Sequence, residues 1–327
     1  MDPPRDNVPD AIQSCHEAGV KVFMVTGDHQ LTAKAIATQI GLLKSEDNIE
    51  LLQGGNEPND INSWNKSLGA IIHGTRVNDL TDHHWEFLLS CTGGVCFART
   101  TPAQKRLIVE KCQVFGDGAI VAATGDGVND APALKQANIG VAMGLNGSAV
   151  AQDAADILLM DDNFASIVAG IKEGRIIFDN IKKTIAYIMA HIFPEVMAVL
   201  FSLLIGIPAG LTALQVLSID LGTEMLVAIS LAYEKPESDI MKRSPRNLKT
   251  DRLVSPVLLF YSYVIVGCII TAGCLMSYTY TYWENGLKLS DFFEEGVNNS
   301  DFFTPVSYTH LRAHETKANL VCRLLLE

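Results

Sequence analysis

The most specific chemical pattern in this 327-residue sequence is a string of Asp, Gly and Asn residues in its first half. Residues 124–135 read TGDGVNDAPALK and directly follow the apolar run AIVAA. The glycines let the backbone approach a bound group closely, and Asp126 and Asp130 are spaced to hold a hard cation jointly. Two carboxylates alone would equally suit a capped surface turn. The full string predicts a site for Mg²⁺ and phosphate, because Mg²⁺ prefers one or two carboxylates with water and phosphate oxygens.

Two other motifs also follow apolar runs. Thr26, Gly27 and Asp28 come after KVFMV at 21–25, and Thr26 offers a hydroxyl and a backbone N–H at the head of a helix, which suits a phosphate. Arg99 follows the apolar run 95–98, and Lys105 in the next helix can offset phosphoryl charge. Alone, the first motif is as well explained by a helix cap and the second by a solvated lysine. Together with residues 124–135 they predict one paired site.

The apolar run from Thr184 to Ala232 carries four acidic or basic side chains: His191, Glu195, Asp220 and Glu224. They form two pairs spaced four residues apart, so each pair shares one helix face. Pro194 frees a backbone carbonyl, and Gly222 permits similar loosening of the second helix. Ionisable groups within a membrane span are costly and mark function, although they can also sit near an interface or neutralise one another. Carboxylates beside loosened helices predict a shared cation site formed by Glu195, Asp220 and Glu224.

The elements that must position these residues are of two kinds. Short apolar strands alternate with helices over residues 1–160, which predicts a parallel sheet covered on both faces. The strands are expected at 21–25, 69–73, 95–98, 119–123 and 139–142, and the helices at 10–19, 31–41, 102–112 and 131–137. Residues 44–66 are polar and weakly patterned, which is typical of a surface excursion.

The chain becomes almost wholly apolar after Thr184. The run from Thr184 to Ala232 is long enough for two membrane spans of roughly 20 residues each, and Val254 to Tyr278 is a third. By the positive-inside rule, the basic residues around these runs predict that residues 207–210 and those after Tyr278 face outside. These basic residues are Lys182, Lys183, Lys235, Lys242, Arg243, Arg246, Lys249 and Arg252. The acidic stretch after residue 280 and the sequon at 298–300 fit that orientation.

Composition excludes several classes of protein. The net charge of −12 argues against a nucleic-acid partner, because such binders need a basic face. The seven cysteines fit neither a disulfide framework nor a paired metal motif, so we expect buried, reduced thiols. Residues 1–15 lack the apolar core of a secretory signal, so membrane insertion is expected from the internal spans.

The motifs resemble one known family. MVTGDHQLTAKAIA (24–37), FARTTPAQK (97–105), TGDGVNDAPALK (124–135) and DDNFASI (161–167) resemble the phosphorylation domain of P-type ATPases, which is haloacid-dehalogenase-like. The PE dipeptide at 194–195, SIDLGTEM (218–225) and ISLAYEKPESDIMKRSPRN (229–247) resemble the catalytic α-subunits of Na⁺/K⁺- and H⁺/K⁺-ATPases. The resemblance runs from about residue 1 to 280.

The resemblance implies a fold, a reaction cycle and residue roles. It implies a Rossmann-like α/β phosphorylation domain followed by transmembrane helices, and a cycle in which ATP phosphorylates an Asp and the ion sites then switch sides. Mg²⁺ would be held by Asp126 with Asp130 in support. Catalytic roles would fall to Thr26, Lys105, Asp126 and Asp130, contacts with ATP or phosphate to Thr26, Gly27, Asp28, Arg99, Lys105 and Asn129, and transported-ion ligation to Glu195, Asp220, Glu224 and also His191.

The resemblance also implies where the protein is located and what it contacts. We expect a multi-pass protein of the plasma membrane that contacts lipid and transports monovalent cations. The family's outside loop that docks a β-subunit would follow the third span, where it is expected to be truncated, so binding of a β-subunit is left open. Polar residues, or Lys in proton/potassium pumps, are usual at the position of His191, so His191 raises the alternative of proton-coupled transport.

The sequence departs from the family in one decisive motif. The phosphorylated Asp of the family lies in DKTGT, which these 327 residues do not contain. We therefore expect the chain to be inactive alone, to need the N-terminal portion of the same pump, and to leave an unfilled sheet edge beside 21–25. A membrane-anchored phosphatase of the same superfamily and a non-catalytic truncated product remain the alternatives.

These inferences divide the chain into segments. The expected divisions are the phosphorylation domain (1–163), a linking helix (164–183), a two-span hairpin (184–232), a cytosolic loop (233–253), a third span (254–279), an outside loop (280–303) and a tail unrelated to the family (304–327). The tail resembles translated adaptor sequence, and a divergent outside loop is the alternative.

Overall fold

The computed structural model of the chain describes residues 4–43, 69–116, 118–205, 211–247 and 250–284. The chain divides into two compact units, one of residues 1–174 and 237–251, and the other of residues 175–236 and 252–327. Each unit is described by itself. The polar stretch 44–66, the sequon and the tail from Thr304 lie outside the described residues.

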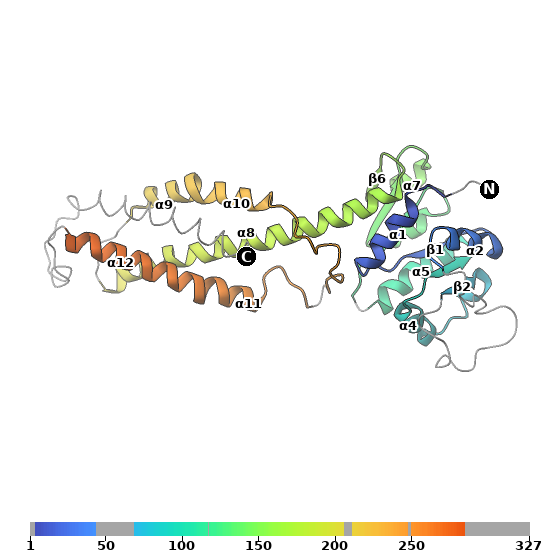
Figure 1. Cartoon of the computed structure of the whole chain (residues 1–327), viewed down its shortest axis with the longest axis horizontal. Coiled ribbons are helices and arrows are strands. Elements are labelled where there is room, and N and C mark those ends of the chain that lie inside the picture. The colour runs from blue at the N-terminus through green and yellow to red at the C-terminus, as the bar shows by residue number, and fades with distance from the viewer. Residues whose placement is uncertain (1–3, 44–68, 117, 206–210, 248–249, 285–327) are drawn as a thin grey trace. The chain divides into compact units, whose positions relative to one another are not determined.

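The first unit alternates strands and helices, as the sequence predicts. Its strands are β1 (Phe23–Val25), β2 (Ala70–His73), β3 (Val95–Ala98), β4 (Ala122–Gly125), β5 (Ile139–Met143) and β6 (Ile157–Leu159). Its helices are α1 (Val8–Glu17), α2 (Gln30–Gln39), α3 (Gly74–Val77), α4 (Asp82–Ser90), α5 (Pro102–Phe115), α6 (Ala131–Gln136) and α7 (Ala149–Ala154). The α/β fold class is thereby confirmed (Figure 1).

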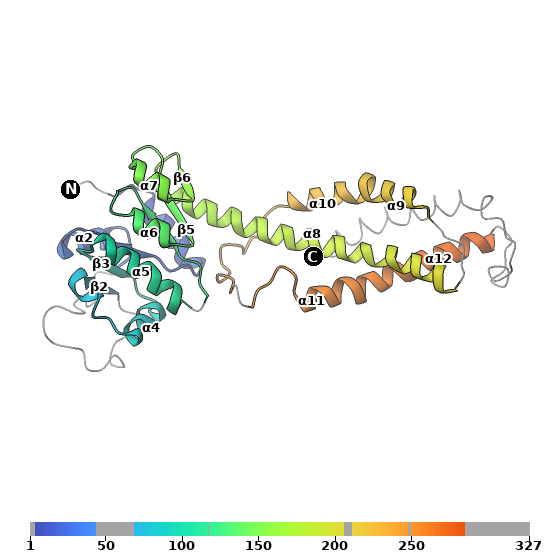
Figure 2. The same cartoon turned by 180° about the vertical axis from the view of Figure 1, so that it is seen from behind.

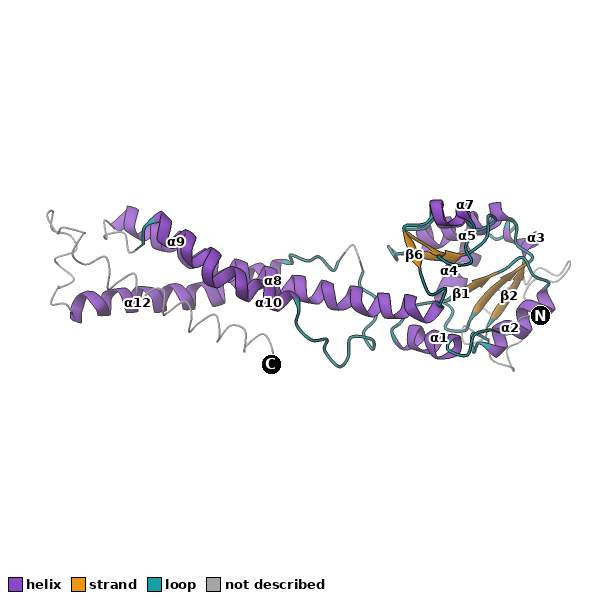
Figure 3. Cartoon of the chain, turned by 90° about the horizontal axis from the view of Figure 1, so that it is seen from above, coloured by secondary structure: helices purple, strands orange, loops and turns teal. Residues whose placement is uncertain are grey.

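The strands are all parallel, but they form two sheets among the described residues. The sheet orders are β1-β3-β2 and β4-β5-β6, and Figure 3 shows the strands in two separate groups. Strand β1 pairs on one side only, with Phe23 opposite Val95. The unfilled edge expected beside residues 21–25 is therefore present in the described part of the chain, and β4 offers a second one.

Helices cover both faces of the first sheet. On one face Ala33 and Ala37 of α2 pack with Ile71 and Cys96 of the strands. On the other face Trp85 of α4 lies over Phe97, with ring centroids 5.9 Å apart. Strand β3 is buried along its whole length, because helices cover both of its faces.

The expectation of a buried strand at 119–123 is wrong. The strand begins at Ala122 and ends at Gly125, and Ala122 is exposed. Ile120, before the strand, is 46% exposed. The reason is topological: β4 is an edge strand that is bonded only to β5 among the described strands, so its apolar side chains lack neighbours on the other side.

Local capping explains where the helices that carry site residues begin. The Thr101 side chain accepts a hydrogen bond from Gln104 N and forms a capping box at the start of α5, with Pro102 in the first turn. The Gln104 side chain also donates to Gly74 O at 2.7 Å. A Cβ on Gly74 would lie 2.1 Å from Arg99 O, so only glycine fits there.

The second unit is helical. Residues 175–205 of α8 (Phe164–Ile205) lie between a segment of α9 (Ala213–Ile219), η2 (Asp220–Glu224) and α10 (Met225–Ala232), and a segment of α11 (Pro256–Leu259), η3 (Phe260–Gly267) and α12 (Cys268–Glu284). Figures 1 and 2 show this arrangement from opposite sides. Three stretches are long and apolar enough to cross a membrane: Phe164–Phe201, Ala213–Ala232 and Pro256–Thr281.

Helix α8 continues through Pro194 without interruption. This is compatible with the expectation that Pro194 frees a backbone carbonyl, because proline lacks the N–H that would bond to it. A proline inside a span can be tolerated where neighbouring groups compensate for the missing hydrogen bond. Gly222 lies within η2, a π-helical turn, so the second span is loosened where the sequence predicts it.

Candidate phosphate and cation sites

The loops after β1 and β3 are joined at the carboxyl ends of these strands. Thr26 N donates to Phe97 O at 2.9 Å, and Thr26 O accepts from both the backbone N and the hydroxyl of Thr100 at 3.0 Å. Arg99 N donates to Asp28 O at 3.0 Å, and Asp28 N donates to the Thr26 hydroxyl at 3.1 Å. The motif that contains Thr26 and the motif that contains Arg99 therefore form one surface.

The side chains on this surface remain accessible. Gly27, Asp28 and Arg99 are exposed, and Thr26 is half-buried. Arg99 has a φ of +54°, a left-handed conformation that a non-glycine residue seldom adopts and that recurs at functional sites. The sequence offered no signal for Thr100, whose hydroxyl fixes the carbonyl of Thr26.

An ion pair links the motif at 97–105 to the motif at 124–135. Lys105 Nζ lies 2.5 Å from Asp130 Oδ1, and the two side chains are 15% and 18% exposed. Gly127 N donates to Asp130 Oδ2 at 3.2 Å, so both carboxylate oxygens of Asp130 have partners. A Cβ on Gly125 would lie 2.5 Å from Cβ of Asp130, so this glycine gives Asp130 its room.

Asp126 and Asn129 differ from Asp130, because both are exposed. The backbone of Asp126 is fixed through its carbonyl, which accepts from Ser148 N at 2.8 Å. An exposed carboxylate on a fixed backbone suits Mg²⁺, which keeps several waters and takes one or two carboxylates. Within the described residues, no hydrogen bond or ion pair joins Asp126 or Asn129 to the side chains of Thr26 or Arg99.

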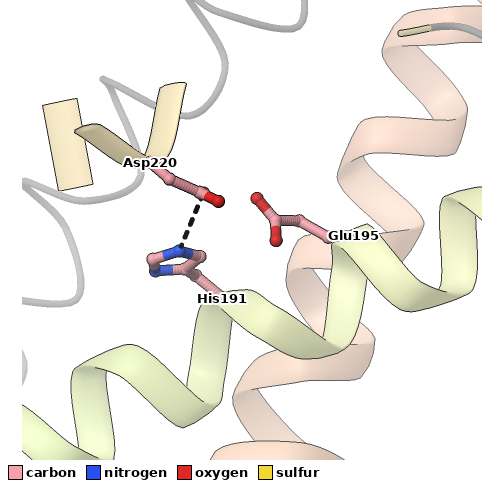
Figure 4. A group of neighbouring side chains, drawn as sticks. All are labelled: His191, Glu195 and Asp220. Atoms are coloured by element: carbon pink, nitrogen blue, oxygen red, sulfur yellow. Dashed lines mark ion pairs between the residues drawn. The ribbon is translucent and has the colours of Figure 1, made fainter. Parts of the chain in front are cut away.

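The cation residues of the second unit lie together. Figure 4 shows His191 and Glu195 on α8 pointing toward Asp220 on η2. One ligand atom from each of these three residues lies within 4.8 Å of the others. His191 Nε2 is 3.8 Å from Asp220 Oδ1, and His191 Nδ1 is 2.8 Å from Glu224 Oε2. The structure therefore brings Glu195, Asp220 and Glu224 together with His191, and the cation site expected from the first three stays a prediction.

The inner end of this cluster is deeply buried. Glu224 and His191 are 6% and 9% exposed. His191 Nδ1 contacts Glu224 as an ion pair, and Asp220 Oδ1 is buried without a hydrogen bond. Such atoms are rare unless a partner or a function accounts for them.

Tyr187 is a member of the cluster that the motifs did not single out. Its hydroxyl donates to Glu224 Oε2, and its ring lies edge-on to His191 with centroids 5.6 Å apart. The available signal was spacing, because Tyr187 precedes His191 by four residues and lies on the same helix face.

The chain combines an α/β unit that has glycine-rich strand ends with apolar helices that carry clustered carboxylates. Two family models match the chain: haloacid dehalogenase-like hydrolase over residues 1–138, and cation transporting ATPase, C-terminus, over residues 208–310. The chain is therefore similar in its first part to haloacid dehalogenase-like hydrolases and in its last part to cation-transporting ATPases, and three of its described helices fit a multi-pass membrane protein.

Curated relatives narrow the resemblance. The chain is 49% identical over 293 residues to sodium/potassium-transporting ATPase subunit alpha-4 of Rattus norvegicus, a match that covers 89% of this chain. It is 50% identical over 289 residues to the alpha subunit of Tetronarce californica and 50% identical over 288 residues to subunit alpha-3 of Homo sapiens, each match covering 88% of this chain. The chain spans 28% of the length of each of these relatives.

Proposed function

We propose that this chain is part of a pump that couples ATP hydrolysis, through an aspartyl-phosphate, to the transport of monovalent cations. The observation that carries this proposal is the meeting of His191, Glu195 and Asp220 on helices apolar enough to span a membrane. Charged groups at such a position mark ion pathways. The relatives are named as sodium/potassium-transporting ATPases, so exchange of these two ions is the form of transport proposed.

The joined loops of the first unit would handle the phosphate. Thr26, Gly27, Asp28 and Arg99 present backbone donors, a hydroxyl and a guanidinium on one accessible surface, to which Asn129 would add an amide. Lys105 would offset phosphoryl charge, and its ion pair with Asp130 holds the ammonium in place. Asp126 would hold Mg²⁺, which would neutralise phosphate charge.

Asp126 and Asp130 would have different roles near the metal. The exposed carboxylate of Asp126 would ligate Mg²⁺ directly. Both oxygens of Asp130 are already engaged by Lys105 and Gly127, which supports a role in which Asp130 orients the cationic side chain.

The phosphorylated aspartate would come from the N-terminal portion of the same pump. The DKTGT motif is absent from the chain, and strands β1 and β4 each have an unpaired edge among the described residues. A strand that carries the aspartate could bond to such an edge beside the phosphate loops. We propose that the chain alone neither becomes phosphorylated nor transports ions.

The membrane unit would bind the ions and contact lipid. Glu195, Asp220 and Glu224 would be the ligands, with His191 among them. Apolar side chains such as Leu203 and Val257, each 78% exposed, would face the acyl chains of the plasma membrane or the other spans of the pump. Docking of a β-subunit would depend on the loop after α12, which lies outside the described residues.

A chimaera tests this function. Residues 1–284 would replace the matched region of sodium/potassium-transporting ATPase subunit alpha-3, and cation-stimulated ATP hydrolysis would be measured. Asp126→Asn is expected to abolish hydrolysis, and Glu195→Gln and Asp220→Asn to lower the apparent affinity for the transported cation. Hydrolysis that is indifferent to Glu195→Gln and Asp220→Asn would refute the membrane half of the proposal.

Proton-coupled transport is the second candidate, and the contact between His191 Nδ1 and Glu224 favours it. An imidazolium between carboxylates would occupy the place of a sodium ion. In the same chimaera His191→Ser is expected to restore Na⁺-stimulated phosphorylation if this candidate holds. If the chimaera already shows full Na⁺ stimulation with His191, and His191→Ser leaves it unchanged, proton-coupled transport is excluded.

A further inference from the structure

We propose that the site formed by His191, Glu195 and Asp220 binds a divalent transition-metal ion such as Zn²⁺, in competition with the monovalent cation. The inference rests on the proposed function only for the role of this site, because the ligands and their geometry belong to the chain itself. A metal of this kind would act at the membrane site as a competing occupant.

The ligand atoms are close enough to share one ion. One atom from each of the three side chains lies within 4.8 Å of the others. Bonds from zinc to imidazole nitrogen or carboxylate oxygen are about 2.0–2.2 Å, so the ligand atoms of one tetrahedral ion lie about 3.3–3.6 Å apart. Small rotations of the two carboxylates, which point into the same space in Figure 4, would close that difference.

The charges also favour a divalent ion. Glu195, Asp220 and Glu224 place three carboxyl groups in the cluster, and a neutral His191 adds a nitrogen without adding charge. A divalent ion offsets two negative charges where a monovalent cation offsets one, and within an apolar span each uncompensated charge is costly.

The orientation of His191 is that of a supported metal ligand. Its Nδ1 faces Glu224 at 2.8 Å, while its Nε2 faces Asp220 at 3.8 Å. Histidines that bind metal commonly direct the second ring nitrogen to a carboxylate, which fixes the ring and raises the basicity of the ligating nitrogen. Glu224 is itself held by the Tyr187 hydroxyl, so Glu224 and Tyr187 would position the ligand without touching the metal.

The nitrogen ligand sets the class of ion. Sodium, magnesium and calcium prefer oxygen donors, whereas imidazole suits zinc, copper, iron and nickel. Asp220 Oδ1, on the side that faces His191 Nε2, is buried and has no hydrogen-bond partner among the described residues, which is a second observation that this oxygen is available to a ligand. Among the described residues, this is the one cluster with such ligand geometry.

The test is metal binding by the full chain in detergent, without ATP. Co²⁺ is the spectroscopic probe, and Zn²⁺ is titrated against it. We expect one Co²⁺ per chain with visible ligand-field bands, displaced by Zn²⁺. His191→Gln and Glu195→Gln should each weaken Zn²⁺ binding by about tenfold or more, since even supporting residues cost about 10–100-fold when removed. His83→Gln is the matched control, because exposed His83 lies 4.0 Å from Glu86 outside the membrane unit.

Each outcome decides the proposal. Unchanged Zn²⁺ affinity in both His191→Gln and Glu195→Gln, with helical circular dichroism intact, would overturn it. Sulfur-to-cobalt charge-transfer bands would overturn it too, because they would place the metal on cysteines. Displacement of Zn²⁺ by equimolar Na⁺ or K⁺ would remove the claimed preference. Because the metal titration contains no ATP, a negative titration would not affect the proposed pump function. A chimaera that fails to hydrolyse ATP would likewise not affect the metal-binding result.

Discussion

Lys105 and Asp130 form a 2.5 Å ion pair between helix α5 and the first residue before helix α6. The pair joins two motifs that are 25 residues apart in sequence, and it is more than four-fifths buried on both sides. A buried pair of this kind is costly to break from one side, because the remaining charge loses its partner. Removing either partner alone is therefore expected to destabilise the first unit.

Asp130→Asn should destabilise the first unit. The change removes the charge that faces Lys105 and puts an amide donor near Gly127 N, so the free energy of unfolding should fall by about 1–3 kcal/mol. The measurement is urea unfolding followed by the fluorescence of buried Trp85, with Trp64 and Trp283 replaced by Phe.

Asp126→Asn is the matched control, since it makes the same chemical change four residues away. The Asp126 side chain is exposed, and its carbonyl would keep the hydrogen bond from Ser148 N. Its effect on stability should stay within about 0.5 kcal/mol, the usual range for surface changes. Equal destabilisation by the two variants would contradict the structural role assigned to Asp130.

Asp162 should make the first unit sensitive to acid. The backbone N–H of Leu145 donates to this carboxylate at 3.0 Å, and together with the Asn146 N–H groups it lowers the pKa of Asp162 below its ordinary value. A lowered pKa in the folded state adds stability that is complete above the unfolded pKa of about 3.9 and is lost as the pH falls through the folded value.

Asp162→Asn should therefore lower the urea midpoint at pH 6 and flatten its decline between pH 5 and 3. The wild-type chain should show the steeper decline. Exposed Asp153→Asn serves as the control and should leave the curve unchanged. A decline as steep in Asp162→Asn as in the wild type would mean that another carboxylate accounts for the acid sensitivity.

Sequence alone predicted the strands with apolar neighbours on both faces and missed what depends on edges. Strand β3 lies at 95–98 as predicted, because its apolar run matches burial on both faces. The strand expected at 119–123 lies at 122–125, since no rule of composition reveals that β4 is an edge strand. β6 was not predicted, because Ile157 and Leu158 are exposed and its three residues give no alternation.

The candidate sites were likewise predicted only where the signal was local in the sequence. Spacing placed His191 and Glu195 on one face of a helix, and this holds in the structure. Spacing could not show that Asp130 turns toward Lys105, or that Tyr187 reaches Glu224, because both are contacts between elements distant in the sequence. Spacing also could not show that α8 continues through Pro194, because the response of a helix to proline depends on its neighbours.

Burial should keep two thiols of the first unit unreactive in the folded chain. Burial raises the pKa of Cys96 and of Cys112 to about 12, so neither forms the reactive thiolate at neutral pH. N-ethylmaleimide at pH 7.5 in detergent should therefore modify Cys96 and Cys112 only after denaturation. Peptide mass spectrometry checks this, and rapid labelling of Cys96 in the folded chain would contradict it.

Gly267→Ala should loosen the contact between η3 and α8. A Cβ at Gly267 would lie 2.7 Å from Cδ1 of Phe193 and 3.0 Å from its Cγ, closer than packed carbons allow. Phe193 is also edge-on to Tyr263, so its ring has little freedom to move away. Overpacking of this kind costs about 1–3 kcal/mol. The expected result is a lower midpoint of thermal unfolding, measured by helical circular dichroism in detergent.

Gly174→Ala is the control for the glycine change itself. A Cβ at Gly174 in α8 would meet nothing within 4 Å, so alanine there should stabilise the helix by about 0.5–1 kcal/mol. Phe193→Leu added to Gly267→Ala should recover part of the loss, because the smaller side chain leaves room for the new methyl group. If the double variant is no more stable than Gly267→Ala alone, the clash with Phe193 is not the cause. Since Phe193 lies two residues from Glu195, the same overpacking should also weaken Co²⁺ binding at the membrane site.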